Sequence, residues 1–128
     1  MIITGGFLAD AAAAVDGLLH VWGGVVTFVT VSPDRHAQLT LVVLTQLDSG
    51  SLDRRVQVEI VPPPGGNGQN TILDWEVPEV ATASEIGFAY LQFVAQYPVD
   101  GRYVFMVSGV GDDSAVSIPL LVRSAPMG

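Results

Sequence analysis

The stretch Phe88-Ala-Tyr-Leu-Gln-Phe-Val-Ala-Gln-Tyr-Pro-Val-Asp-Gly-Arg-Tyr-Val-Phe-Met-Val107 predicts a strand, a tight corner and a second strand. Side chains alternate between the two faces of a strand, so each of these strands is expected to carry one apolar face. The two apolar faces comprise Leu91, Phe93 and Ala95 on the first strand and Tyr103, Phe105 and Val107 on the second. Between the strands, Pro98-Val99-Asp100-Gly101 combines a proline-fixed φ with a glycine that can reach positive φ, which is typical of a turn.

Alternating apolar residues and turn residues divide the rest of the chain into further strands. We expect strands over residues 2–8, 19–31, 37–45, 55–61, 71–77 and 115–123. Four alanines at 11–14 favour a helical turn, whereas the Asp16-Gly17 pair that follows is typical of a hairpin, so both conformations stay open there. Residues 78–86 form a connection without a clear pattern.

Three features refine these strands. Gly5-Gly6 indicates a bulge in the first strand, and Gly23-Gly24 interrupts residues 19–31 at a point where the apolar parity changes. Residues 37–45 are apolar on both faces, which predicts a central or interfacial strand. Pro119 cannot donate a ladder hydrogen bond, so the last strand is expected at a sheet edge.

These patterns predict an all-β protein, because they give about eight strands separated by turns and no stretch has a sustained helical period. The stretch from Tyr97 to Tyr103 resembles the corner before the penultimate strand of immunoglobulin-like sandwiches, where an early tyrosine ties the corner by hydrogen bonding. We therefore expect a single domain over residues 1–128, an immunoglobulin-like antiparallel β-sandwich of about 7–8 strands. Its structural corner would comprise Pro98, Gly101 and Tyr103.

The composition is unusually apolar. Hydrophobic residues make up 49% of the chain and charged residues 14%, where a soluble domain carries about 25% charged residues. The mean hydropathy is +0.47. Either some strands are buried on both faces, or part of the surface is covered by copies of the chain or by a partner.

The charge distribution argues against nucleic-acid binding. The formal net charge is −8, and the chain has no lysine. Its five cations are Arg35, Arg54, Arg55, Arg102 and Arg123. An acidic chain with scattered arginines lacks the basic footprint that a phosphate backbone requires.

The chain contains no cysteine, so disulfides, thiolate metal sites and thiol catalysis are excluded. Its first residues lack the positive start of a secretory signal, and apolar runs such as Leu41–Leu44 are far shorter than the ~20 residues that span a bilayer. We therefore expect a protein that is cytoplasmic at synthesis, with no membrane partner, and that could later be carried in a virion.

The N-terminal third resembles a small family of bacterial and phage-encoded proteins of unknown function. The residues that carry the resemblance are Leu8-Ala9-Asp10, Asp16-Gly17-Leu18-Leu19 and Gly23-Gly24. Members of that family often have lysine where this chain has Leu18. The resemblance implies a β-sandwich and brings no activity, cofactor or catalytic residue with it.

Residue patterns for catalysis are weak. His20 and His36 have neither the number nor the spacing of zinc ligands, and solvated or hydrogen-bonded histidines account for them better. Neither Gly50-Ser51 nor Ser108-Gly109 matches a nucleophile elbow. The glycines at 65–68 lack the Lys-Ser/Thr of a phosphate loop. We expect no catalytic residue, no cofactor and no metal site, and hence no enzyme.

Aspartates in turns leave one binding alternative open. They are Asp10, Asp16, Asp48, Asp53, Asp100, Asp112 and Asp113. Sandwich domains can hold Ca²⁺ with aspartates from several loops, although aspartate is also a common turn former. A small sandwich that binds Ca²⁺ or a carbohydrate is therefore the alternative function.

The two tryptophans divide between packing and binding. Trp75 shares parity with Leu73 and Val77, which favours a place in the core. Trp22 lies beside Gly23 and Gly24, which would let another backbone approach, so these three residues are the candidate interface.

Low charge, strands apolar on both faces and the lack of a recognisable site favour a non-enzymatic structural or interaction module. Such a module would form homo-oligomers or dock on a larger protein assembly. The family resemblance permits a phage virion as the setting, with the chain as a decoration or tail-associated component.

Overall fold

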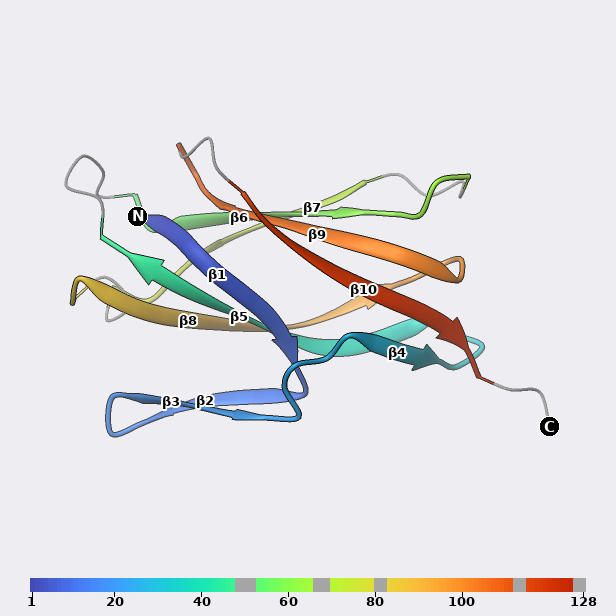
Figure 1. Cartoon of the computed structure of the whole chain (residues 1–128), viewed down its shortest axis with the longest axis horizontal. Helices are drawn as coiled ribbons and strands as arrows, with labels where there is room; N and C mark the ends of the chain where they lie inside the picture. The colour runs from blue at the N-terminus through green and yellow to red at the C-terminus, as the bar shows by residue number, and fades with distance from the viewer. Residues whose placement is uncertain (48–52, 66–69, 80–82, 112–114, 126–128) are drawn as a thin grey trace.

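A computed structural model describes residues 1–47, 53–65, 70–79, 83–111 and 115–125. The described residues form ten β-strands (Figure 1). These are β1 (Ile2–Ala9), β2 (Ala11–Val15), β3 (Leu18–Trp22), β4 (Phe28–Val31), β5 (His36–Gln46), β6 (Arg55–Val61), β7 (Thr71–Glu76), β8 (Ile86–Gln96), β9 (Gly101–Gly109) and β10 (Val116–Ser124). The protein is all-β, as predicted, and within these ranges no helix is long and apolar enough to cross a membrane.

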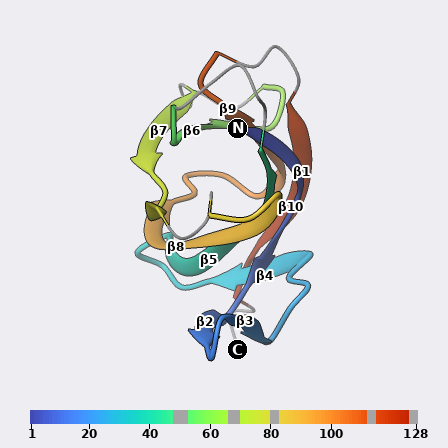
Figure 2. The ribbon, with the colours of Figure 1, turned by 90° about the vertical axis from the view of Figure 1, so that its left-hand side faces the viewer.

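The strands form two larger sheets and a separate hairpin. The order is β1-β5-β8 in a three-stranded sheet and β4-β10-β9-β6-β7 in a five-stranded sheet, while β2 pairs with β3. All the pairings are antiparallel except that of β4 with β10, which is parallel. Figure 2 shows that the five-stranded sheet is curled into a half-barrel whose open side faces β5 and β8.

The core lies between these two sheets. Buried side chains of β5 and β1 on one side meet buried side chains of β6, β9 and β10 on the other. One direct contact across the gap joins Phe93 of β8 to Phe105 of β9, with ring centroids 5.8 Å apart. The predicted alternation holds along β6, where Val56, Val58 and Ile60 are buried and Gln57 is exposed.

The central strand of the smaller sheet is buried on both faces. Leu41 and Val43 belong to the core between the sheets, whereas Val42 points to the opposite face and is also fully buried. The second face is covered because the β2–β3 hairpin folds back over it and contacts β5 and β8. The side chains of β2 are mostly alanines, which allow this close approach, and the Thr40 hydroxyl donates to the Asp10 carbonyl at 3.3 Å.

The hairpin settles the conformation of residues 11–22. Asp16 and Gly17 have φ values of 53° and 77°, so they form the two-residue turn with positive φ that joins antiparallel strands. The helical alternative for residues 11–14 is therefore wrong. The predicted single strand over residues 19–31 is also wrong, because Gly23 ends β3 and a separate strand, β4, begins at Phe28 in the other sheet.

Two further strand details can be compared with the sequence. The pairing register of β1 with β5 shifts between Ile3 and Gly5, which is the predicted irregularity in the first strand. The expectation that the last strand lies at an edge is only half right. β4 pairs with Leu121–Ser124, so this half of β10 has neighbours on both sides, whereas Pro119 lies in the half that pairs with β9 alone among the described strands.

Candidate functional site

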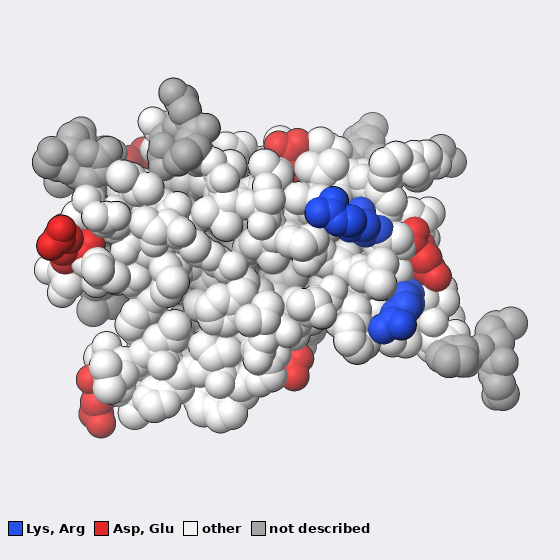
Figure 3. Space-filling view, in the orientation of Figure 1, with Lys and Arg blue, Asp and Glu red and all other residues white. Residues whose placement is uncertain are grey.

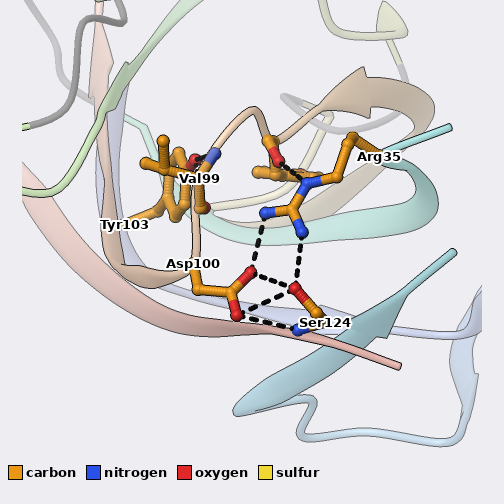
Figure 4. Close-up of polar contacts among 6 residues, drawn as sticks. Arg35, Val99, Asp100, Tyr103 and Ser124 are labelled. Atoms are coloured by element: carbon orange, nitrogen blue, oxygen red, sulfur yellow. Dashed lines mark hydrogen bonds and ion pairs between the residues drawn. The ribbon is translucent and has the colours of Figure 1, made fainter. Parts of the chain in front are cut away.

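The corner between β8 and β9 connects the two sheets and is tied by a tyrosine (Figure 4). The Tyr103 hydroxyl donates a hydrogen bond of 2.8 Å to the carbonyl oxygen of Val99 and accepts one of 3.2 Å from the amide of the same residue. Gly101 has a φ of 137°, and a Cβ there would lie 2.8 Å from the Pro63 side chain. Tyr103 is 2% exposed, so the corner is part of the packed core.

A single arginine joins this corner to two other segments (Figure 4). The Arg35 Nε donates to the Tyr97 carbonyl at 2.9 Å, and its Nη1 donates to the Ser124 hydroxyl at 2.8 Å. Its Nη2 lies 2.8 Å from an Asp100 carboxylate oxygen. The Tyr97 amide also donates to the Arg35 carbonyl at 2.8 Å. Arg35 therefore fastens the turn before β5, the β8–β9 corner and the end of β10 together.

Two pKa shifts follow from this arrangement. Hydrogen bonds from Ser124, together with Arg35, lower the pKa of the Asp100 carboxyl below its ordinary value. Burial raises the pKa of the Tyr97 hydroxyl, which is fully buried and has no hydrogen-bond partner among the described residues. The Tyr97 ring packs edge-on against Tyr103 at 5.1 Å. These groups tie the corner to the end of β10 and to the turn before β5, which is a structural role.

The base of the β2–β3 hairpin is fastened by backbone hydrogen bonds. The Asp10 amide donates to the carbonyls of Trp22 and Gly23 at 3.1 and 3.3 Å, and the Val26 amide donates to the Leu8 carbonyl at 2.7 Å. Gly23 has a φ of 63°, and a Cβ there would collide with the Asp10 carboxyl group. A Cβ at Gly24 would lie 2.8 Å from Val21. The space beside the two glycines is therefore filled by Asp10 and Val21 of the same chain. The sequence predicted instead that the backbone of another molecule would approach there.

The outer face of the hairpin is apolar and exposed. Register pairs Trp22 with Ala11, His20 with Ala13 and Leu18 with Val15, so these six residues share one face. Leu18 is 65% exposed and Trp22 is 54% exposed, and the Trp22 ring stacks on His20 at 6.4 Å. In Figure 3 the surface over the hairpin carries acidic groups only at its two ends. We call these six residues the hairpin face.

The turn aspartates that the structure describes do not come together. Asp10 lies at the base of the hairpin and Asp16 at its tip, while Asp53 pairs with Arg55 and Asp100 with Arg35. Asp48, Asp112 and Asp113 lie outside the described residues. In the described part of the chain, no group of three or more His, Cys, Asp or Glu residues could hold a metal ion.

The other residues considered as catalytic or binding candidates lie on strands, in the core or on the exposed surface. His36 is exposed, with its Nδ1 3.9 Å from a carboxylate oxygen of Asp34. Trp75 packs against the core, as its parity predicted. Ser108 and Gly109 belong to β9, whereas Gly50, Ser51 and residues 66–69 lie outside the described ranges.

Two features of the surface had no sequence signal. Arg35 follows a predicted turn, but nothing in the sequence indicated its partners at Asp100 and Ser124. The fold-back of the hairpin over β5 was also missed, because four alanines show neither a helical nor a strand period. Alternation along the strand could have indicated the exposed face. Leu18, His20 and Trp22 lie on one side of β3, while Leu19 and Val21 lie on the other side.

Comparison with known proteins does not add a family. No protein-family model matches the chain, and no curated protein matches it. The resemblance of the N-terminal third to a phage-encoded family therefore stays a prediction.

Proposed function

We propose that the chain is a non-enzymatic interaction module that assembles with copies of itself or docks on a larger protein assembly. The observation that carries this proposal is the hairpin face, where Leu18 and Trp22 are more than half exposed and charged groups are confined to the ends. Contiguous apolar surface of this kind is typical of a protein–protein contact, and tryptophan is a frequent anchor of such contacts.

The fold of the hairpin favours a role in binding over a role in stability. Its inner face already covers β5, so the outer face contributes nothing to the core and still exposes large apolar side chains to water. The family that the N-terminal third resembles often has lysine at the position of Leu18, which is the most exposed of these residues. The apolar character of the tip is thus a property of this chain, and a phage particle is the setting that the resemblance favours.

The scaffold that presents the hairpin is, we propose, immunoglobulin-like. Two observations support this assignment. The strand orders β1-β5-β8 and β10-β9-β6 correspond to the two sheets of such domains, with the β8–β9 corner crossing between them. A tyrosine near the start of β9 bonds back to the corner, as in that class. The hairpin is then an insertion between β1 and β4, and the curled five-stranded sheet is a departure from the flat sandwich.

A pair of surface variants tests the proposal. Leu18→Ser combined with Trp22→Ser removes the apolar groups of the hairpin face, while Ile72→Ser, at a 56% exposed position on β7, is the matched control. Light scattering at micromolar concentration measures assemblies of the purified chain, and mass spectrometry of purified virions from the source culture detects docking. We expect the double variant, with an unchanged melting temperature, to lose the docking, or the assembly made through the hairpin face, that the control retains. A wild-type chain that neither assembles nor co-purifies with particles contradicts the proposal.

A further inference from the structure

The free edge of the three-stranded sheet is formed by β8, an eleven-residue strand. β5 pairs with it along its whole length, from His36 opposite Gln96 to Gln46 opposite Ile86. No other strand of the described residues pairs with its second edge. The edge is therefore long and unpaired among the described strands, which is the form that accepts an additional strand.

The other edges of the two larger sheets are protected in ways that β8 is not. β7 has six residues and carries Asp74 and Glu76, and Glu76 pairs with Arg54 at 2.9 Å. β4 has only four residues, and the Arg123 guanidinium lies over its Phe28 ring at 4.4 Å. β1 is interrupted by its register shift and lies beside β10. β8, by contrast, contains no charged residue and no proline, which are the usual devices against edge pairing.

The core is also less well covered along β8 than along its neighbour. The inward residues of β9 at Tyr103, Phe105 and Val107 are all buried. The inward residues of β8 at Leu91 and Phe93 are only half-buried. On the outward side, Ile86 is 74% exposed and Val94 is 62% exposed. A strand added at this edge would cover both the inward and the outward apolar side chains of β8.

We propose that β8 pairs with β8 of a second copy, antiparallel about a two-fold axis at Tyr90, to give a continuous six-stranded sheet. Because each copy carries a net charge of −8, contact between two copies is least opposed where charged side chains are absent, and the uncharged β8 edge meets that condition. This goes beyond the proposed function, because it assigns the contact between two copies to the β8 edge and leaves the hairpin face for docking on a larger assembly.

The register follows from matching the exposed apolar positions. An axis at Tyr90 places Ile86 of one copy opposite Val94 of the other, twice, and Tyr90 opposite itself. On the inward side the same register places Phe93 opposite Gly87, a pairing in which the ring covers the open glycine backbone. An axis at Leu91 would instead place Ile86 opposite Gln96. The register about Tyr90 therefore buries more apolar surface.

Two hollows flank the ends of this edge and leave room for the partner's side chains. One, of about 440 Å³, is lined by Ile86, Phe88 and Tyr90 together with Ala14 of the hairpin. The other, of about 370 Å³, is lined by Val94 together with Leu73 and other residues across the opening between the sheets. In the two-fold arrangement the partner's Val94 reaches the first hollow, which lies on the outward side of β8.

The absence of cysteine makes a disulfide test direct. Facing Cα atoms in antiparallel strands lie about 4.5–5.5 Å apart, within disulfide range. Under mild oxidation we expect Tyr90→Cys to form a covalent dimer. Val94→Cys alone should form no covalent dimer, but it should cross-link when mixed with Ile86→Cys. Ile72→Cys is the control that should not cross-link. Cross-linking of Val94→Cys to itself, or failure of the mixed pair and of Tyr90→Cys, overturns the register and the proposal.

A charge test separates this inference from the proposed function. Val94→Lys places a cation opposite the partner's Ile86 and, because the residue is exposed, should leave the melting temperature of the monomer unchanged. We expect dimerisation, measured by light scattering, to weaken by about tenfold or more. The Leu18→Ser/Trp22→Ser variant should dimerise normally. A dimer that resists Val94→Lys but disappears in the hairpin variant overturns the β8 interface and leaves the proposed function standing, and a wild-type monomer overturns the β8 interface.

Discussion

The hydroxyl of Tyr103 lies 2.8 Å from the carbonyl oxygen of Val99, four residues earlier in the chain, and closes the corner that carries the polypeptide from one sheet to the other. Both residues are packed against the core, so this hydrogen bond is shielded from water. Arg35 holds the same corner from outside, through the carbonyl of Tyr97 and the carboxylate of Asp100.

Removing the hydroxyl of Tyr103 should destabilise the fold without altering its surface. We expect Tyr103→Phe to lower the free energy of unfolding by about 0.5–1.5 kcal/mol, because the Val99 carbonyl loses its partner while the ring keeps its packing. Denaturant unfolding measures this difference. Tyr90→Phe is a suitable control, since the Tyr90 hydroxyl accepts only a long, exposed hydrogen bond of 3.2 Å from the Ala14 amide. Equal stability of Tyr103→Phe and wild type would mean that the corner bond contributes nothing.

Arg35 should matter more than the other paired arginines. Its guanidinium contacts three segments and is 20% exposed, so Arg35→Met should cost about 1.5–3 kcal/mol in the free energy of unfolding. Arg54→Met removes a single surface pair with Glu76 and should cost at most about 1 kcal/mol. Chemical denaturation of both variants checks the order. Arg35→Lys should recover only part of the loss, because one ammonium group cannot reproduce the fork of the guanidinium.

The Asp100 carboxyl makes the free energy of unfolding depend on pH in the acid range. Its pKa is lowered in the folded state, so in the range below the ordinary aspartate value of about 3.9 the unfolded chain binds more protons than the folded chain. The contribution of Asp100 is therefore present at neutral pH and is lost as the pH falls through its folded pKa. We expect Asp100→Asn to be less stable than wild type at pH 7 and nearly equal to it at the acid end, as measured by thermal melting across pH. A stability difference between Asp100→Asn and wild type that grows as the pH falls would contradict a lowered pKa of Asp100. Asp53→Asn is the comparison, because Arg55 lowers the pKa of Asp53 to about 2.

Substitutions at two glycines of the hairpin distinguish the cost of backbone strain from the cost of a steric collision. Gly17 and Gly23 both have positive φ, but a Cβ at Gly17 meets no atom within 4 Å, whereas one at Gly23 collides with Asp10. Gly17→Ala should cost about 1 kcal/mol, and Gly23→Ala should cost clearly more. Hydrogen exchange at β5 should rise in Gly23→Ala, since the hairpin would lift from that strand. Adding Asp10→Ala should remove only part of the excess cost, because the Asp10 Cβ would still lie 2.8 Å from the added atom. Equal effects of the two glycine changes would contradict this account.

The sequence predicted those parts of the fold in which alternation and turn chemistry act locally. β6 was predicted with its observed bounds, 55–61, because its apolar residues alternate without interruption. The bulge in β1 and the central place of β5 followed from Gly5-Gly6 and from apolar residues on both faces.

The sequence could not predict features that depend on long-range placement. The hairpin folds over β5 because alanine is small, yet small side chains leave no periodic pattern to recognise. The ion pair of Arg35 with Asp100 joins turns that are far apart in the chain, so neither turn indicates the other. The open edge of β8 depends on which strands lie beside it, and the alternation of its own residues is the same whether an edge is paired or free.

The parallel pairing of β4 with β10 has a consequence for the order in which the protein can be made and folded. Phe28 lies opposite Leu121, and the other residues of β4 pair with the three residues that follow Leu121. During synthesis β4 must therefore stay unpaired until β10 has been produced. The five-stranded sheet can close only after translation has passed residue 124, and a nascent chain halted before β10 would leave Val29 and Val31 without their partner strand.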